Sequence, residues 1–229
     1  MKGSTATPPA VPAGRLRHAP VTRRIPGRNY TKGEITLRTL DGKRFAVKDY
    51  RPRPFLMRQT LGRYLVGREC RAYHAAGRID GLARYAGRVD RFALATEWVE
   101  GRTLNGFAPG AQPADLFERL AGLLRALHER GVALADLHRR DVIVGPRGEL
   151  TVVDLAAAWM LKPGAARAAR AAFVRLCCQD EIALARMRAH YHGEDEAAVL
   201  AALDPAAVAR YRRARAVKSF VDRVRRGGS

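Results

Sequence analysis

Cysteines, long apolar runs and aromatic residues are all scarce in this chain of 229 residues. The cysteines are Cys70, Cys177 and Cys178, and an odd set with two adjacent members has neither metal-ligand spacing nor the pattern of a disulfide framework. No stretch is long and uncharged enough to cross a bilayer, and the first residues lack the apolar core of a secretory signal. We therefore expect a cytoplasmic protein, either soluble or peripheral on the inner face of the cell membrane.

Acidic residues are also scarce, with 22 Asp and Glu against 42 Lys and Arg and a formal charge of +20. Such a charge suits an anionic partner, whether nucleic acid, an acidic membrane face or a phosphorylated substrate. Because the basic residues are mostly Arg amid abundant Ala and Gly, the compositional bias of a genome is an equal explanation. Binding of single-stranded nucleic acid normally needs exposed aromatic side chains, and aromatic residues make up only 7% of this chain.

The hydrophobic fraction of 47% indicates a globular protein after a distinct N-terminal stretch. Residues 1–27 contain no acidic residue and no periodicity, which predicts a disordered basic tail. From Glu34 apolar and polar residues alternate on both sides of Asp41-Gly42, a strong signal for a two-residue turn. The sequence therefore predicts an antiparallel hairpin whose second strand carries Lys48.

A helix of about twenty residues is predicted after Pro54, because apolar positions recur at every fourth residue. Glu69 falls on the same stripe as Leu65 and Tyr73, so it is expected to be buried. A buried carboxylate needs a cation, and Lys48 on the neighbouring hairpin can supply it. The alternative places Glu69 at the edge of the stripe, in water or paired with an Arg.

The remaining pattern predicts two more strands, a helix, a second hairpin and two Ala- and Arg-rich helices, which makes the fold class α+β. The expected spans are 86–89, 92–98, 114–130, 142–153, 164–191 and 205–226. The last helix has one apolar side and one basic side. It could lie on an acidic membrane surface, or pack its apolar side on the protein and expose the basic one.

Three aspartates surround the second hairpin. Asp141 comes directly before its first strand and Asp154 directly after its second, so antiparallel pairing sets them roughly opposite each other. Facing carboxylates repel unless a cation lies between them, and Mg²⁺ prefers one or two carboxylates with waters and phosphates. Asp136 lies one loop earlier. The alternative is that these residues only cap turns at strand ends, as Asp often does.

The order of these candidate residues along the chain resembles the order found in the protein-kinase fold. Ala46-Val47-Lys48 resembles the strand lysine that holds the nucleotide phosphates, and Glu69 resembles its helix partner. Glu97-Trp98-Val99 resembles the hinge, in which the Glu97 carbonyl and the Val99 amide would contact adenine.

The resemblance continues through residues 134–141, which are similar to the catalytic loop. It implies that Asp136 is the base and that Asp141 stands where the family usually has Asn, which keeps an oxygen ligand. Asp154-Leu155-Ala156 stands where the family has its metal-binding Asp-Phe-Gly. The resemblance implies ATP and Mg²⁺ as cofactors, a small antiparallel N-terminal lobe over residues 28–104, and a compact, mostly helical C-terminal lobe over residues 105–229.

Two departures narrow this interpretation. No Gly-x-Gly-x-x-Gly loop precedes the first hairpin, where Gly27 and Gly33 are the nearest glycines, and Gly33 is the expected nucleotide contact. About ten residues separate Asp154 from the next predicted helix, with no Ala-Pro-Glu element and no room for a peptide-docking platform. The chain therefore looks more like the bacterial lipopolysaccharide-core kinases, including the 3-deoxy-D-manno-octulosonic acid kinases, and RIO-type kinases share this trimming.

The resulting expectation is an ATP-dependent phosphotransferase that acts on a sugar hydroxyl of a lipid-linked glycan at the cytoplasmic membrane face. One alternative is a RIO-type Ser/Thr protein kinase. Another is a pseudokinase whose basic surface binds nucleic acid or a partner protein.

Overall fold

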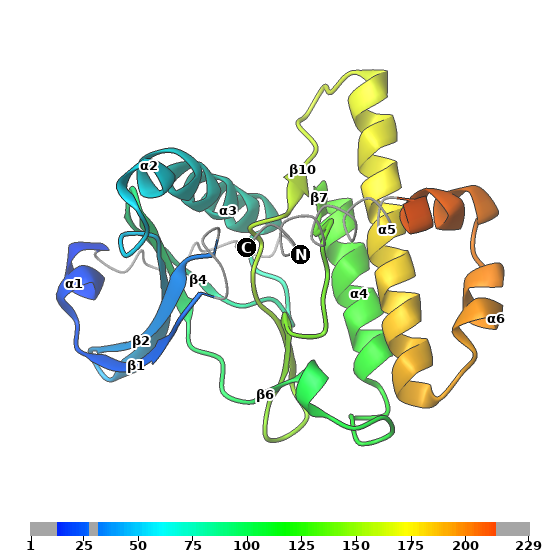
Figure 1. Cartoon of the computed structure of the whole chain (residues 1–229), viewed down its shortest axis with the longest axis horizontal. Helices are drawn as coiled ribbons and strands as arrows, with labels where there is room; N and C mark the ends of the chain where they lie inside the picture. The colour runs from blue at the N-terminus through cyan, green and yellow to red at the C-terminus, as the bar shows by residue number, and fades with distance from the viewer. Residues whose placement is uncertain (1–12, 28–31, 214–229) are drawn as a thin grey trace, which may run out of the picture.

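The computed structural model describes residues 13–27 and 32–213 (Figure 1). A five-stranded antiparallel sheet forms the N-terminal part, and a mostly helical part follows it. The expected α+β class is confirmed. Within the described ranges, no helix is both long and apolar enough to cross a membrane.

The sheet has the strand order β1-β2-β3-β5-β4. Its members are β1 (Val21–Ile25), β2 (Glu34–Leu40), β3 (Lys43–Asp49), β4 (Tyr85–Asp90) and β5 (Ala93–Glu97). The predicted hairpin is β2–β3, and its turn residues Asp41 and Gly42 both have positive φ, 50° and 73°. Lys48 pairs with Ile35 on one side and Leu94 on the other, so it lies on the central strand.

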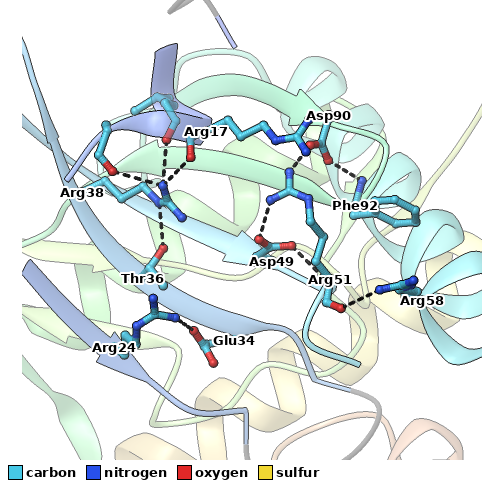
Figure 2. A network of polar contacts seen from close by, with 12 residues as sticks. Arg17, Arg24, Glu34, Thr36, Arg38, Asp49, Arg51, Arg58, Asp90 and Phe92 are labelled. Atoms are coloured by element: carbon cyan, nitrogen blue, oxygen red, sulfur yellow. Dashed lines mark hydrogen bonds and ion pairs between the residues drawn. The ribbon is translucent and has the colours of Figure 1, made fainter. Parts of the chain in front are cut away.

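The prediction of a disordered tail is wrong for residues 13–25, which form α1 (Ala13–His18) and β1. Leu16, only 1% exposed, packs into a cluster with Phe45 and Val47. The Arg38 guanidinium donates to the carbonyls of Leu16, Arg17 and Ala19, at 3.2, 2.7 and 3.1 Å (Figure 2). One buried leucine and one arginine on the next strand thus fix a segment that has no periodicity of its own. Residues 1–12 lie outside the described residues.

The predicted helix after Pro54 runs as α2 (Phe55–Met57), a π-helical turn (Arg58–Gly62) and α3 (Arg63–Ala76). At the π-helical turn the backbone passes close to Tyr50, since a Cβ on Gly62 would lie 3.0 Å from the Cβ of Tyr50. The helix ends where Gly77 adopts a φ of 61° and donates its amide to the Tyr73 carbonyl at 2.9 Å.

The helical part contains α4 (Leu116–Glu129), α5 (Arg167–His192) and α6 (Glu196–Ala201), and residues 205–213 are also helical. The predicted helix at 205–226 is therefore present as far as residue 213, and its remainder lies outside the described residues. Short strands surround the second hairpin: β6 (Arg102–Thr103), β7 (Val132–Ala133), β8 (Val142–Val144), β9 (Leu150–Val152) and β10 (Trp159–Met160). β6, β8 and β9 form a three-stranded sheet in this order. The 142–152 hairpin therefore lies beside β6, the strand that follows β5 in the chain.

One hydrophobic core joins the two parts. Val66 of α3, Leu94 of β5, Leu120 of α4 and Val152 of β9 all belong to it. Backbone hydrogen bonds strengthen the junction, because Ala83 donates to the Val152 carbonyl at 2.9 Å. In Figure 1, α3 extends from the sheet to the helices, so it can hold a side chain between the two parts.

Candidate active site

Lys48 lies at the centre of the candidate site. Its ammonium is 2.9 Å from Glu69 Oε2 and 2.8 Å from Asp154 Oδ1, which joins β3, α3 and the segment after β9. The Glu69 side chain is 2% exposed and that of Lys48 is 11% exposed. The structure thus brings Lys48 and Glu69 together as the sequence predicts, and Glu69 does not face water.

The electrostatics of this group follow from one cation shared by two carboxylates. Burial alone would lower the pKa of Lys48, but the charges of Glu69 and Asp154 outweigh it and hold that pKa well above its ordinary value. Burial raises the pKa of Glu69, and Lys48 only partly offsets this rise. Burial also acts to raise the pKa of Asp154, but the charge and hydrogen bond of Lys48 bring it below the ordinary value. Lys48 therefore stays protonated and Asp154 stays ionised.

Asp141 lies beside this cluster, because the Val153 amide next to Asp154 donates to the Asp141 carbonyl at 2.8 Å. Burial, followed by the negative charge of Asp154, raises the pKa of Asp141 to about 7. Among the described residues, no Lys, Arg or His forms an ion pair with the Asp141 carboxylate. A half-buried carboxylate that forms no ion pair within the described residues and lies next to a second carboxylate is in an environment that favours a hard cation.

The oxygen ligands present here fit Mg²⁺ bound together with phosphate. In the part of the chain that the structure describes, no group of three or more His, Cys, Asp or Glu side chains could enclose a metal ion. Two carboxylates suit Mg²⁺, which usually keeps waters and phosphate oxygens in its shell instead of a cage made only of protein. Lys32 adds a second cation, with its Nζ 3.7 Å from Asp154 Oδ2.

Asp136 lies on the exposed side of the same region. Its carboxylate Oδ1 is 3.2 Å from His138 Nε2, and the two side chains are 40% and 44% exposed. The backbone is strained on both sides of the site, since Ala135 and Asp154 have φ values of 63° and 78° without being glycine. The tertiary structure therefore holds both segments in conformations that they would not adopt alone.

Asp180 of α5 holds the loop that carries Asp136, and sequence reasoning missed it. Its carboxylate is 1% exposed and accepts hydrogen bonds from the amides of Leu134 and Ala135, both at 2.8 Å. His128 of α4 is 3.0 Å from the same carboxylate. A signal was present, because Asp180 lies seven residues from both Phe173 and Met187, which places an acid on the buried face of the helix.

Arg68 is a second residue that sequence reasoning missed. From α3 it donates to the carbonyls of Ala157 and Ala158, at 2.6 and 3.1 Å. The helix that carries Glu69 is thereby fastened to the segment that follows Asp154. No sequence pattern pairs an arginine with carbonyls ninety positions away, so only the structure shows this contact.

Three other predicted residues surround this cluster less closely. Gly33 is buried, and a Cβ there would lie 3.2 Å from the Lys48 Cγ, so its lack of a side chain leaves room for the lysine. Glu97 ends β5 and donates its amide to the Arg84 carbonyl at 2.8 Å. Val99 is partly buried in the connection to β6. Among the described residues no ion pair joins Glu97 to Lys48, and the predicted roles of Glu97 and Val99 stay predictions.

The cavity of about 560 Å³ beyond β6 is separate from these residues. Its walls include Arg102, Phe107, Gln112 and Pro146, and none of the predicted site residues lines it. The chemistry-bearing side chains therefore lie outside this hollow.

A scan against models of protein families and a search of curated proteins gave no match to this chain.

Proposed function

We propose that this protein is an ATP-dependent phosphotransferase with a protein-kinase-like fold. The observation that carries the proposal is the Lys48 ammonium shared between Glu69 and Asp154, with the Asp141 carboxylate beside them and, among the described residues, in no ion pair. A buried ion pair contributes little net stability, so two carboxylates on one buried lysine, with a third carboxylate beside Asp154, make better sense as a site than as a support for the fold. The antiparallel sheet followed by a helical part is compatible with this fold.

Each residue then has a role that its environment supports. Lys48, held by Glu69, binds the phosphates of ATP, while Asp141 and Asp154 hold Mg²⁺, which when bound neutralises charge on those phosphates. Asp136 is exposed, so it can orient an acceptor hydroxyl and accept its proton. Most of the rate would come from positioning and electrostatics instead of covalent chemistry.

The proposed acceptor is a sugar hydroxyl of a lipid-linked glycan, with the protein peripheral on the cytoplasmic face of the membrane. The short connection from Asp154 to α5 supports this acceptor. It consists of residues 155–166, which include the two-residue strand β10. So short a segment leaves no platform for docking an extended peptide. The net charge of +20 suits an acidic surface.

Two alternatives share parts of this site. A RIO-type protein kinase would use the same residues on a Ser or Thr hydroxyl. A pseudokinase that binds an anionic partner is favoured by one contact, because Lys48 occupies an Asp154 oxygen that the metal would need.

The experiment that separates these three proposals is transfer of labelled γ-phosphate from ATP. We expect label in a glycolipid that carries 3-deoxy-D-manno-octulosonic acid and none in a protein acceptor. Asp136→Asn should lower the transfer rate about 10²- to 10⁴-fold, because it removes the base, while nucleotide affinity stays unchanged. Transfer to protein alone would support the RIO-type alternative. Transfer to neither acceptor, with nucleotide still bound, would support the pseudokinase.

A further inference from the structure

An exposed apolar surface begins the helix that carries Glu69. Phe55, Leu56 and Tyr64 are 66%, 74% and 57% exposed, although side chains of this size are usually covered. In Figure 1, α2 lies at the end of this helix that points away from α4 and α5. We call these three residues, with Arg53, Arg58 and Arg63, the α2 surface.

The charge of this region has one sign. From residue 51 to residue 68 the sequence contains five arginines and no acidic residue. Two of the five are used internally, since Arg51 pairs with Asp49 and Asp90 (Figure 2) and Arg68 donates to backbone carbonyls.

The other three arginines are those of the α2 surface. Among the described residues, Arg53, Arg58 and Arg63 form no ion pair with a carboxylate. Arg58 and Arg53 donate to backbone carbonyls at 3.4 and 3.5 Å, and among the described residues their buried Nε atoms have no hydrogen-bond partner. The Arg58 guanidinium also lies over the Phe55 ring, 5.5 Å from its centre. The surface therefore combines exposed apolar side chains with one exposed cation, Arg63, and two half-buried ones, Arg53 and Arg58.

We propose that the α2 surface docks on an anionic lipid bilayer, with Phe55 and Leu56 inserted below the headgroups and the arginines against lipid phosphates. Helices that bind at a membrane interface typically expose Phe and Leu side chains among basic residues. Nucleic acid fits less well: Phe55 and Tyr64 could stack on bases, but Leu56, the most exposed of the three side chains, is aliphatic and would be covered by a bilayer and not by a base.

This docking would bring the candidate site close to a membrane-bound acceptor. The acceptor itself is part of the proposed function, on which this step rests. Leu56 and Glu69 are thirteen residues apart in one nearly continuous helix, which corresponds to about 20 Å. The candidate active site would thus be held no more than about 20 Å from the inserted side chains. The docking itself requires no nucleotide.

The first test reports on the surface directly, because the highly basic chain can also adhere to anionic lipid elsewhere. We would compare Phe55→Trp with Val174→Trp, whose position on α5 is 59% exposed, after subtracting the fluorescence of the natural tryptophans. With phosphatidylglycerol-containing vesicles that carry brominated acyl chains, the tryptophan at 55 should be quenched and that at 174 should not. Vesicle binding with no quenching at 55 would overturn the proposal.

Two further outcomes would assign the surface to another occupant and also overturn the proposal. One is a response of the tryptophan at 55 to single-stranded RNA but not to vesicles. The other is a blue shift that depends on protein concentration alone, which would indicate a second copy of the chain.

The second test is vesicle affinity. Phe55→Ser combined with Leu56→Ser should weaken partitioning onto phosphatidylglycerol-containing vesicles by about tenfold or more, whereas Val174→Ser should have no effect. Thermal stabilisation by Mg·ATP should be the same in both variants. Equal vesicle affinity in the double variant and the wild type would overturn the docking proposal, whereas absence of nucleotide stabilisation in every protein would instead overturn the proposed function.

Discussion

At the scale of single residues, the buried contact between Lys48 and Glu69 predicts a stability effect as well as a binding effect. Lys48→Met removes the cation from a carboxylate that is 2% exposed, and we expect a loss of about 3 kcal/mol in the free energy of unfolding. Lys48→Met combined with Glu69→Leu should regain most of this loss, because the fully buried carboxylate is removed with its cation. The remaining carboxylate, Asp154, is 27% exposed and keeps Lys32 at 3.7 Å. Urea unfolding measures both variants.

Neither variant should bind Mg·ATP, so the double variant separates folding from function. If the double variant were as unstable as the single one, burial of Glu69 would not be the cause. If it bound nucleotide normally, Lys48 would have no role with the phosphates.

Asp141 predicts a dependence of stability on pH. Its pKa rises from 3.8 to about 7 on folding, so between these values the folded chain keeps a proton that the unfolded chain has lost. The contribution of Asp141 to stability therefore falls as pH rises through this window and stays low above it. In the absence of metal and nucleotide, Asp141→Asn should flatten this part of the profile and add about 2 kcal/mol at pH 8.

The measurement is urea unfolding of both proteins at a series of pH values. If the stability profiles of the two proteins ran parallel from acid to alkaline pH, folding would not disfavour the ionised form of Asp141. As a matched control we would use Asp115→Asn, since Asp115 is exposed and pairs with Arg119 on the surface.

At the scale of elements, the hydrogen bonds from Asp180 of α5 predict an effect on turnover through the loop that carries Asp136. Asp180→Asn replaces one acceptor oxygen by an amide that faces the Leu134 and Ala135 amides. We expect faster hydrogen exchange at these two amides and a fall of about tenfold or more in kcat, with KM for ATP nearly unchanged.

The control for this prediction is Asp195→Asn, because Asp195 also accepts a backbone amide, at the start of α6, but is far from the loop in the chain. It should change neither quantity. A rise in KM for ATP with kcat unchanged in Asp180→Asn would contradict the role of Asp180 in positioning the loop.

The elements also show what the sequence can and cannot predict. The turn at Asp41-Gly42 and the four-residue spacing through Glu69 are local signals, so the β2–β3 hairpin and the helix over 55–76 were predictable. The segment of α1 and β1 was not, because its position depends on Leu16 packing, on Arg38 contacts with the carbonyls of α1 and on pairing of β1 with β2. For the same reason the prediction of a disordered tail failed in residues 13–25. Residues 1–12 lie outside the described residues and do not test it.

The candidate site was predictable where a residue type and its spacing together implied chemistry. Lys48, Glu69, Asp141 and Asp154 were found this way, and the structure gathers them. Asp180 and Arg68 act on backbone groups, so their partners leave no trace in sequence spacing, although the spacing of Asp180 from Phe173 and Met187 places it on the buried face of its helix. The positioning of a site is therefore harder to predict than its charged centre.

At the scale of the whole molecule, one core fixes the sheet and the helices together, so the residues of the site keep their arrangement. A ligand that contacts Lys48 from the sheet and Asp154 from the helical part should therefore stabilise the entire fold. Such a ligand adds about 2.7 kcal/mol at a concentration of about 100 Kd.

The measurement that tests the central claim most directly is thermal unfolding with Mg·ATP, with ATP and EDTA, and without ligand. We would apply it to the wild type, to Asp154→Ala and to Asp115→Ala as the control. The account predicts an increase in Tm of about 5–10 °C that requires Mg²⁺, persists in Asp115→Ala and is lost in Asp154→Ala. No increase in the wild type, or an equal increase in Asp154→Ala, would contradict a nucleotide site at these residues.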